Sequence, residues 1–138
     1  MNDKALGLLG LARKARYVEL GEEPAGASCR SQKARLLLVA SDAGEHTVRR
    51  ARSYCRSGKP VCIQAPFTKS ALGGALGVSV CAICAVTDPA LALAFVQALG
   101  EPERYAAALD ELTRQTARVT KRRQEEKAHR NNIKHGKK

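Results

Sequence analysis

The chain has 138 residues, of which 24 are Lys or Arg and 13 are Asp or Glu, so its formal net charge is +11. This length suits one compact domain with an extension. Hydrophobic residues make up 44% of the chain, which excludes a wholly disordered protein. The sequence has no uninterrupted apolar run of about 18 residues, so we expect no transmembrane helix.

Short apolar runs alternate with segments of helical periodicity along the chain. A first helix carries Arg13, Lys14 and Arg16 at its C-terminal end, where basic side chains suit the helix dipole. Further helices are predicted at 22–32, 45–57, 69–76 and 89–99, and strands at 17–20, 36–40, 60–65 and 80–86. Thr68 and Asp88 are the predicted N-caps of the last two helices. This alternation predicts an α/β layer fold with four strands between helices.

The C-terminal part has a different composition. Residues 113–138 hold 10 of the basic side chains and only 2 of the acidic ones. We therefore divide the chain into a domain at 1–100 and a basic extension at 101–138. A helical stripe from Tyr105 to Val119 either packs on the domain or meets a partner, and the part after Thr120 is expected to be disordered or only nascently helical in isolation. A basic extension favours nucleic acid as a partner, and a merely solubilising tail is the alternative.

Five cysteines, an odd number, suggest free thiols in a reducing cytoplasm. Cys81 and Cys84 form a single C-x-x-C in a predicted strand, where side chains three apart point to opposite faces. We therefore interpret them as small buried hydrophobic residues. His46 is the only histidine of the predicted domain, and no nucleophile–base pair, phosphate-binding loop or metal-ligand cluster is visible. We predict no enzymatic activity, cofactor, metal or small-molecule substrate.

Several separated motifs occur in a fixed order between residues 4 and 99. They are GLLGLARKAR at 7–16, Gly21-Glu22-Glu23, KARLLLVASDAGEHT at 33–47, and LGGALG at 72–77 followed by a Val-rich segment. In these motifs the sequence resembles the kink-turn-binding ribosomal protein superfamily, of the L-seven-Ae and L-thirty-e type, and most closely its small bacterial members. The resemblance implies a three-layer α-β-α sandwich with a mixed four-stranded sheet.

The resemblance also implies binding to structured RNA, often a kinked helix with sheared G·A pairs. One contact would come from Gly21, Glu22 and Glu23, and a second from the loop Gly77–Val80 (Gly77, Val78, Ser79 and Val80), which would shelter an extruded base. The family pattern Gly-x-Asn-Glu-x-x-Lys is altered here, because Glu23, Pro24 and Ala27 stand in place of Asn, Glu and Lys. An ionised Glu only accepts hydrogen bonds, whereas Asn also donates them.

Basic residues near the ends of elements are predicted to flank this face and to contact RNA. These residues are Arg13, Lys14, Arg16, Lys33 and Arg35, with Arg122 and Arg123 added from the extension. We thus expect a cytoplasmic, non-enzymatic RNA-binding protein, with ribosomal RNA as its most favoured partner and with the ribosome or ribosomal proteins as further partners. The alternative is a protein-interaction or scaffold module that uses the Tyr105–Val119 stripe.

Overall fold

The computed structural model describes residues 3–135, with side chains as far as Asn131. The helices are α1 (Asp3–Lys14), α2 (Glu22–Arg30), α3 (Glu45–Gly58), α4 (Lys69–Leu76), α5 (Pro89–Ala98) and α6 (Ala106–His135). The strands are β1 (Val18–Leu20), β2 (Leu36–Val39), β3 (Val61–Gln64) and β4 (Ile83–Val86). Within the described residues no helix is both long enough and apolar enough to cross a lipid bilayer.

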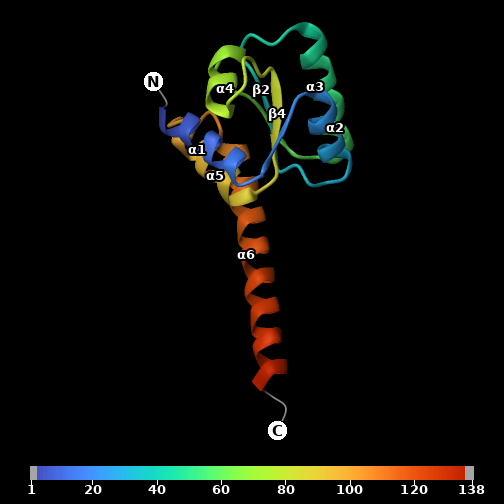
Figure 1. Ribbon diagram of the computed structural model, residues 1–138, viewed down its shortest axis with the longest axis vertical. Helices are drawn as coiled ribbons and strands as arrows, with labels where there is room; N and C mark the ends of the chain where they lie inside the picture. Colours follow the sequence, from blue (N-terminus) through green and yellow to red (C-terminus); the bar gives the residue numbers. More distant parts are fainter. Residues whose placement is uncertain (1–2, 136–138) are drawn as a thin grey trace.

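The four strands form one mixed sheet in the order β1-β4-β2-β3. β4 lies antiparallel to both β1 and β2, while β2 and β3 are parallel. The helices α2 and α3 cover one face of the sheet, and α1, α4, α5 and the first part of α6 cover the other (Figure 1). The predicted α-β-α sandwich with a mixed four-stranded sheet is therefore confirmed.

Strand β2 shows why a continuous apolar run forms the centre of the sheet. All four of its residues are buried. Leu36 and Leu38 face the α1, α4, α5 and α6 layer, whereas Leu37 and Val39 face α2 and α3. Because successive side chains alternate between the faces of a strand, a strand covered on both sides needs apolar residues at every position.

The connections between elements gather at two opposite edges of the sheet. We call the upper edge the one where β1, β2 and β3 end and β4 begins; α2, α3 and α4 all start there. We call the lower edge the one where β1, β2 and β3 begin and β4 ends. Figure 1 shows α6 leaving the body below, on the side away from the loops around α4.

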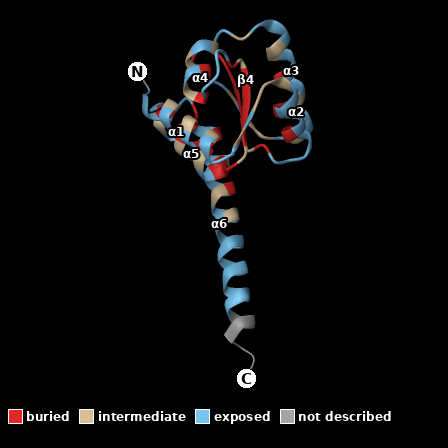
Figure 2. Ribbon diagram, viewed as in Figure 1, coloured by how far each residue is buried: buried red, intermediate tan, exposed pale blue. Residues whose placement is uncertain are grey.

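Most of the extension forms one continuous helix, α6, and of the two alternatives for the part after Thr120, disordered or helical, the structure has the helical one as far as His135. Its first half packs into the core through Ala108 and Leu112, next to the buried Tyr105 that precedes the helix, while the described side chains from Thr120 to Asn131 are exposed (Figure 2). Ion pairs one turn apart support the solvent-facing side of the helix in both halves, such as Arg114 with Asp110 at 2.7 Å and Lys121 with Glu125 at 4.0 Å. The most apolar part of the Tyr105–Val119 stripe is thus covered by the protein's own domain and is not available to a partner.

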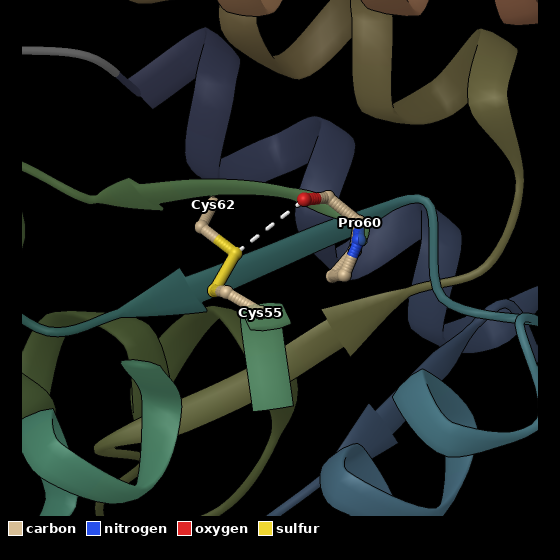
Figure 3. The surroundings of a disulfide bond; sticks show 3 residues. All are labelled: Cys55, Pro60 and Cys62. Atoms are coloured by element: carbon tan, nitrogen blue, oxygen red, sulfur yellow. Dashed lines mark hydrogen bonds between the residues drawn. A yellow bond between two sulfur atoms is a disulfide. The ribbon is translucent and has the colours of Figure 1, made fainter. Parts of the chain in front are cut away.

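Two cysteine expectations are also corrected. Cys55 of α3 and Cys62 of β3 form a disulfide with a Cα–Cα distance of 6.5 Å, and the Cys62 sulfur lies 3.5 Å from the Pro60 carbonyl oxygen (Figure 3). The free-thiol prediction therefore holds only for Cys29, Cys81 and Cys84. It failed because an odd count of five requires only one unpaired cysteine and because the turn between α3 and β3 brings Cys55 and Cys62 together.

The second correction concerns the start of the last strand. β4 begins at Ile83 rather than at residue 80, so Cys81 lies in the preceding loop and its thiol can meet that of Cys84. A hydrogen bond between the two thiols lowers the pKa of Cys81, against the opposing effect of burial, and raises the pKa of Cys84, which burial raises further. Both residues are buried in the core, as the interpretation of small hydrophobic side chains requires.

Candidate nucleic-acid interface

The segments Gly21–Glu23 and Gly77–Val80 lie together at the upper edge, although they are far apart in the sequence. β1 ends beside the start of β4, and the Gly21 N–H donates a hydrogen bond to the Ile83 carbonyl oxygen at 3.0 Å. The loop that carries Gly77–Val80 leads directly into β4 and so reaches the same place. The antiparallel pairing of β1 with β4 is what brings the two segments into one site.

A hollow of about 330 Å³ lies between these segments. Its walls are mostly aliphatic, with one carboxylate and one hydroxyl among them; the lining residues are Leu20, Gly21, Glu22, Thr47, Val78, Val80, Cys81, Ala82 and Ile83. Val78 and Val80 expose 37% and 62% of their surface to solvent. Exposed aliphatic side chains beside a hollow with a few polar groups are typical of a binding site.

Glycines give the two segments their shape. Gly21 has φ 91° and Gly77 has φ 77°, both in the left-handed region that other residues rarely adopt. Gly73 of α4 lets the following loop fold back closely, since a Cβ at this position would lie 2.7 Å from the Ser79 carbonyl oxygen. The loop that carries Val78 and Val80 is therefore held against α4 by backbone contact.

Glu22 is the only charged side chain in the lining, and residues of α3 fix its position. The Thr47 hydroxyl donates to Glu22 Oε1 at 2.9 Å, and Arg50 Nη1 lies 3.8 Å from Oε2. Arg50 Nε in turn donates to His46 Nε2 at 3.0 Å. Glu23, by contrast, is exposed and does not line the hollow.

Sequence reasoning missed Thr47 and Arg50 as part of this site. Their spacing of three residues places both on one side of α3, directly after its start at Gly44. This spacing alone could have shown that they share a face, but it could not show that the face meets α2. The pairing of α2 with α3 over the sheet is a tertiary feature.

Two helix N-termini open at the upper edge without a side-chain cap. α2 begins after Gly21 and α3 after Gly44, and in the described chain no side chain caps either one. The first-turn N–H groups of such helices point outward as hydrogen-bond donors. α4 differs, because Thr68 accepts from Ala71 N at 3.1 Å and Asp42 accepts from Lys69 N at 2.7 Å. Donors are thus offered beside the hollow by α2 and α3, while Pro24 removes one donor from α2.

The structure corrects the expectation that basic residues flank this face. The loops and first helical residues of the upper edge carry more acidic than basic side chains: Glu22, Glu23, Asp42 and Glu45 against Lys69. Of the predicted basic contacts, Arg13 comes nearest to the loop, because its guanidinium donates to the Leu76 carbonyl oxygen at 3.2 Å. Lys14 follows it at the end of α1 and is exposed.

The other predicted basic contacts lie at the lower edge or on α6. Arg16 precedes β1, and Lys33 and Arg35 precede β2. The Arg35 guanidinium faces α6 rather than open solvent, with Nη1 at 3.5 Å from Gln115 Oε1. Arg123 Nη2 lies 3.8 Å from Asp88 Oδ1 at the start of α5, and Arg122 is exposed on α6. The connectivity separates these residues from the hollow, because they sit at the opposite ends of the strands.

Comparison with known proteins gave one curated relative and two informative structures, while no family model matches the chain. The RNA-binding protein YlxQ of Bacillus subtilis (strain 168) is 33% identical over 85 residues, which span 62% of this chain and 84% of that protein. A solved protein of unknown function from Bacillus halodurans C is 28% identical with a TM-score of 0.65, and the match covers 71% of this chain and 98% of that one.

The second structure is the Giardia lamblia 15.5kD RNA binding protein. It is 22% identical with a TM-score of 0.59, and the match covers 72% of this chain and 84% of that one. At this level of identity the likeness supports the fold alone.

Proposed function

The chain belongs to the family of the RNA-binding protein YlxQ, and on that premise we propose that it binds structured RNA at the upper edge without catalysing a reaction. One observation carries this proposal. Two segments that the family resemblance indicates as RNA contacts meet at a single open hollow, which Gly21 and Glu22 line from one segment and Val78 and Val80 from the other.

The lining of the hollow suits an unstacked base. An extruded base needs apolar cover for its ring faces and polar partners for its edge. Val78 and Val80 offer the cover. The Glu22 carboxylate, held by Thr47 and Arg50, accepts hydrogen bonds from base amino and imino groups. The first-turn N–H groups of α2 and α3 supply donors for base or phosphate oxygens.

Recognition of this kind favours RNA that is already distorted. A base in a regular duplex is stacked and paired, and it must be unstacked before it can enter the hollow. A sharply kinked helix presents such a base without that cost. We therefore propose kinked RNA as the ligand, with ribosomal RNA, in the ribosome or during its assembly, as the target.

The charge distribution agrees with base reading rather than phosphate attraction at this site. The rim is locally acidic, so binding there depends on matched hydrogen bonds and on burial of the valines. Bulk electrostatic attraction must come from elsewhere on the molecule, since the net charge is +11.

The test measures the affinity of the protein for two fluorescent RNA hairpins of the same length. One contains a kinked internal loop with sheared G·A pairs, and the other is fully paired. We expect the kinked RNA to bind at least tenfold more tightly. Val80→Asp places a charge at the mouth of the hollow and should remove this preference. Ala107→Asp is the control, because Ala107 is an exposed residue in the first turn of α6 that does not line the hollow.

Equal affinity of the wild-type protein for both RNAs would contradict kink recognition. Equal loss of affinity in Val80→Asp and Ala107→Asp would contradict the placement of the site. Both variants change exposed residues, so circular dichroism should show that each keeps the fold.

A further inference from the structure

The two edges of the sheet carry opposite charge. The loops of the lower edge and the helix ends beside them carry mainly basic residues, among them Arg16, Arg30, Lys33, Arg35 and Lys59, whereas Asp88 is the acidic residue of these loops. Asp88 is already engaged, because it caps α5 at Leu91 N (2.9 Å) and lies 3.8 Å from Arg123. The basic excess of the body is thus concentrated at the end away from the hollow.

Helix α6 extends this basic surface beyond the body. It has 30 residues, which corresponds to a length of about 45 Å. Arg35 with Gln115 and Arg123 with Asp88 connect it to the lower edge, so the exposed part of the helix leaves the body next to these basic residues (Figures 1 and 2). Beyond Thr120 the described side chains include five basic and two acidic residues, all exposed.

Several of these cations have no acidic partner in the described part of the chain. On α6 they are Arg122, Lys127 and Arg130, and on the lower edge they are Arg16, Arg30, Lys33 and Lys59. Lys127 and Arg130 follow Arg123 at a spacing of four and three residues, so they lie on the same side of α6 as the residue that pairs with the body. The lower edge and the exposed half of α6 therefore form the two parts of one basic surface.

Two of the lower-edge cations stand at backbone positions where glycine is usually found. Arg16 has φ 68° and Lys59 has φ 55°, at turn positions that follow α1 and α3. Glycine is the residue favoured at such positions, and Gly77 occupies the corresponding position after α4. After α1 and α3 a cation stands in place of glycine, and after α2 the uncharged Gln32 (φ 62°) does.

We propose that the lower edge and the exposed half of α6 form a second nucleic-acid-binding surface, which binds the phosphate backbone of an RNA duplex. α3 runs from one edge to the other over 14 residues, or about 21 Å, and the two surfaces face opposite directions. Because the surfaces face opposite directions, a straight duplex seated on the second surface leaves the hollow open, so a single protein molecule holds two RNA segments. The duplex as ligand rests on the proposed function, whereas the existence of a polyanion surface at this end rests on the charges alone.

The first measurement is the affinity of the full chain for a regular 20-base-pair RNA duplex as a function of salt. Two double variants probe the two parts of this surface. Arg16→Gly with Lys59→Gly changes the lower edge, and Lys127→Gln with Arg130→Gln changes α6. Each should weaken duplex binding at least fivefold and lower the salt slope by about 2, since each phosphate contact contributes roughly 0.9. The glycine variants favour the observed backbone conformation, so a loss of folding cannot explain their effect.

The control removes the same charge elsewhere. Lys4→Gln with Arg104→Gln changes two exposed residues, one in the first turn of α1 and one beyond the far end of α5. This variant should bind the duplex within twofold of the wild-type protein. If it loses as much affinity as the lower-edge variants, or if the wild-type protein does not bind the duplex, the second surface does not exist.

The second measurement tests whether both RNAs bind at once. The kinked hairpin is fixed to beads, loaded with protein, and offered the fluorescent duplex. We expect the wild-type protein to retain the duplex and the lower-edge variants to release it while they stay on the beads. Free duplex should displace Val80→Asp from the beads, because this variant holds the stems of the hairpin through the second surface alone, and this separates failure of the hollow from failure of the second surface. Displacement of the wild-type protein from the beads by the duplex would overturn the proposal, because it would mean that both RNAs use one surface.

Discussion

At the scale of single residues, Gly73 allows the loop that lines the hollow to lie directly against α4. It lies in α4, yet the atoms nearest to its missing Cβ belong to the loop at Val78 and Ser79. The next residue, Gly74, has open space at the same position. The close approach of the loop therefore requires glycine at position 73 but not at position 74.

We predict that Gly73→Ala destabilises the fold by about 1–3 kcal/mol, because the loop backbone must move away from the new methyl group. The displaced loop carries Val78 and Val80, so affinity for kinked RNA should fall as well. Gly74→Ala should leave RNA binding unchanged and stabilise the protein by about 0.5–1 kcal/mol through helix propensity. Urea unfolding and RNA titration of both variants check this. Equal stability of the two variants would show that α4 and the loop are not in backbone contact.

Single residues also show which features of the site could be predicted from the sequence and which could not. Thr68 and Asp88 were predicted as N-caps and accept the expected hydrogen bonds from Ala71 N and Leu91 N, because a cap is a local feature. Glu22 was predicted as an RNA contact, but its partners Thr47 and Arg50 were not found. They come from another helix, and only packing brings that helix to Glu22.

At the scale of elements, α6 is one helix with two roles. Ala108 and Leu112 of its first half are buried, as is Tyr105 just before the helix, whereas the described side chains from Lys121 to Asn131 are exposed. Composition correctly indicated a change of character along this segment. It could not show that the helix continues through the change, because helix continuity here depends on anchoring of the first half in the core.

We expect Leu112→Ala to cost about 2–5 kcal/mol of stability, as is usual for a fully buried leucine. A chain that ends after Thr120 should keep the melting temperature of the full chain within about 2 °C, since the removed part packs against little of the body. Calorimetry of the two variants measures both effects. A large loss of stability on truncation would mean that the exposed half packs on the domain.

The disulfide links α3 to β3 and closes a short loop, with a sequence separation of 7. Loop-closure entropy for this length predicts a stabilisation of about 2–3 kcal/mol. Under non-reducing conditions the unfolded protein should show three reactive thiols, and after reduction it should show all five. The stability of a variant with Cys55→Ser and Cys62→Ser should not respond to reductant. Five reactive thiols without reductant would contradict the pairing.

At the scale of the whole molecule, the basic surface and the hollow lie at opposite edges of the sheet. The sequence showed a large positive charge and two glycine-marked segments, and the simplest interpretation placed them on one face. The fold places Gly21–Glu23 and Gly77–Val80 at an edge with more acidic than basic side chains, and it places Arg16 and Lys33 at the other edge. Residue counts do not contain this information, because it depends on the direction in which each strand runs.

The fold class, by contrast, could be predicted from the sequence. The apolar run at 36–40 required a strand covered on both faces, and the periodic segments around it supplied helices for two layers. The start of β4 was predicted three residues too early, because the apolar stretch around Cys81 continues from the loop into the strand. That error hid the contact between Cys81 and Cys84.

The central claim is that RNA enters the hollow at the upper edge, and ultraviolet crosslinking of the full chain to the kinked hairpin, followed by mass spectrometry of the peptides, tests it most directly. We predict that crosslinks concentrate at residues 20–24 and 77–83, on the two sides of the hollow. Crosslinks confined to the lower edge and α6, with none in those two segments, would contradict the claim.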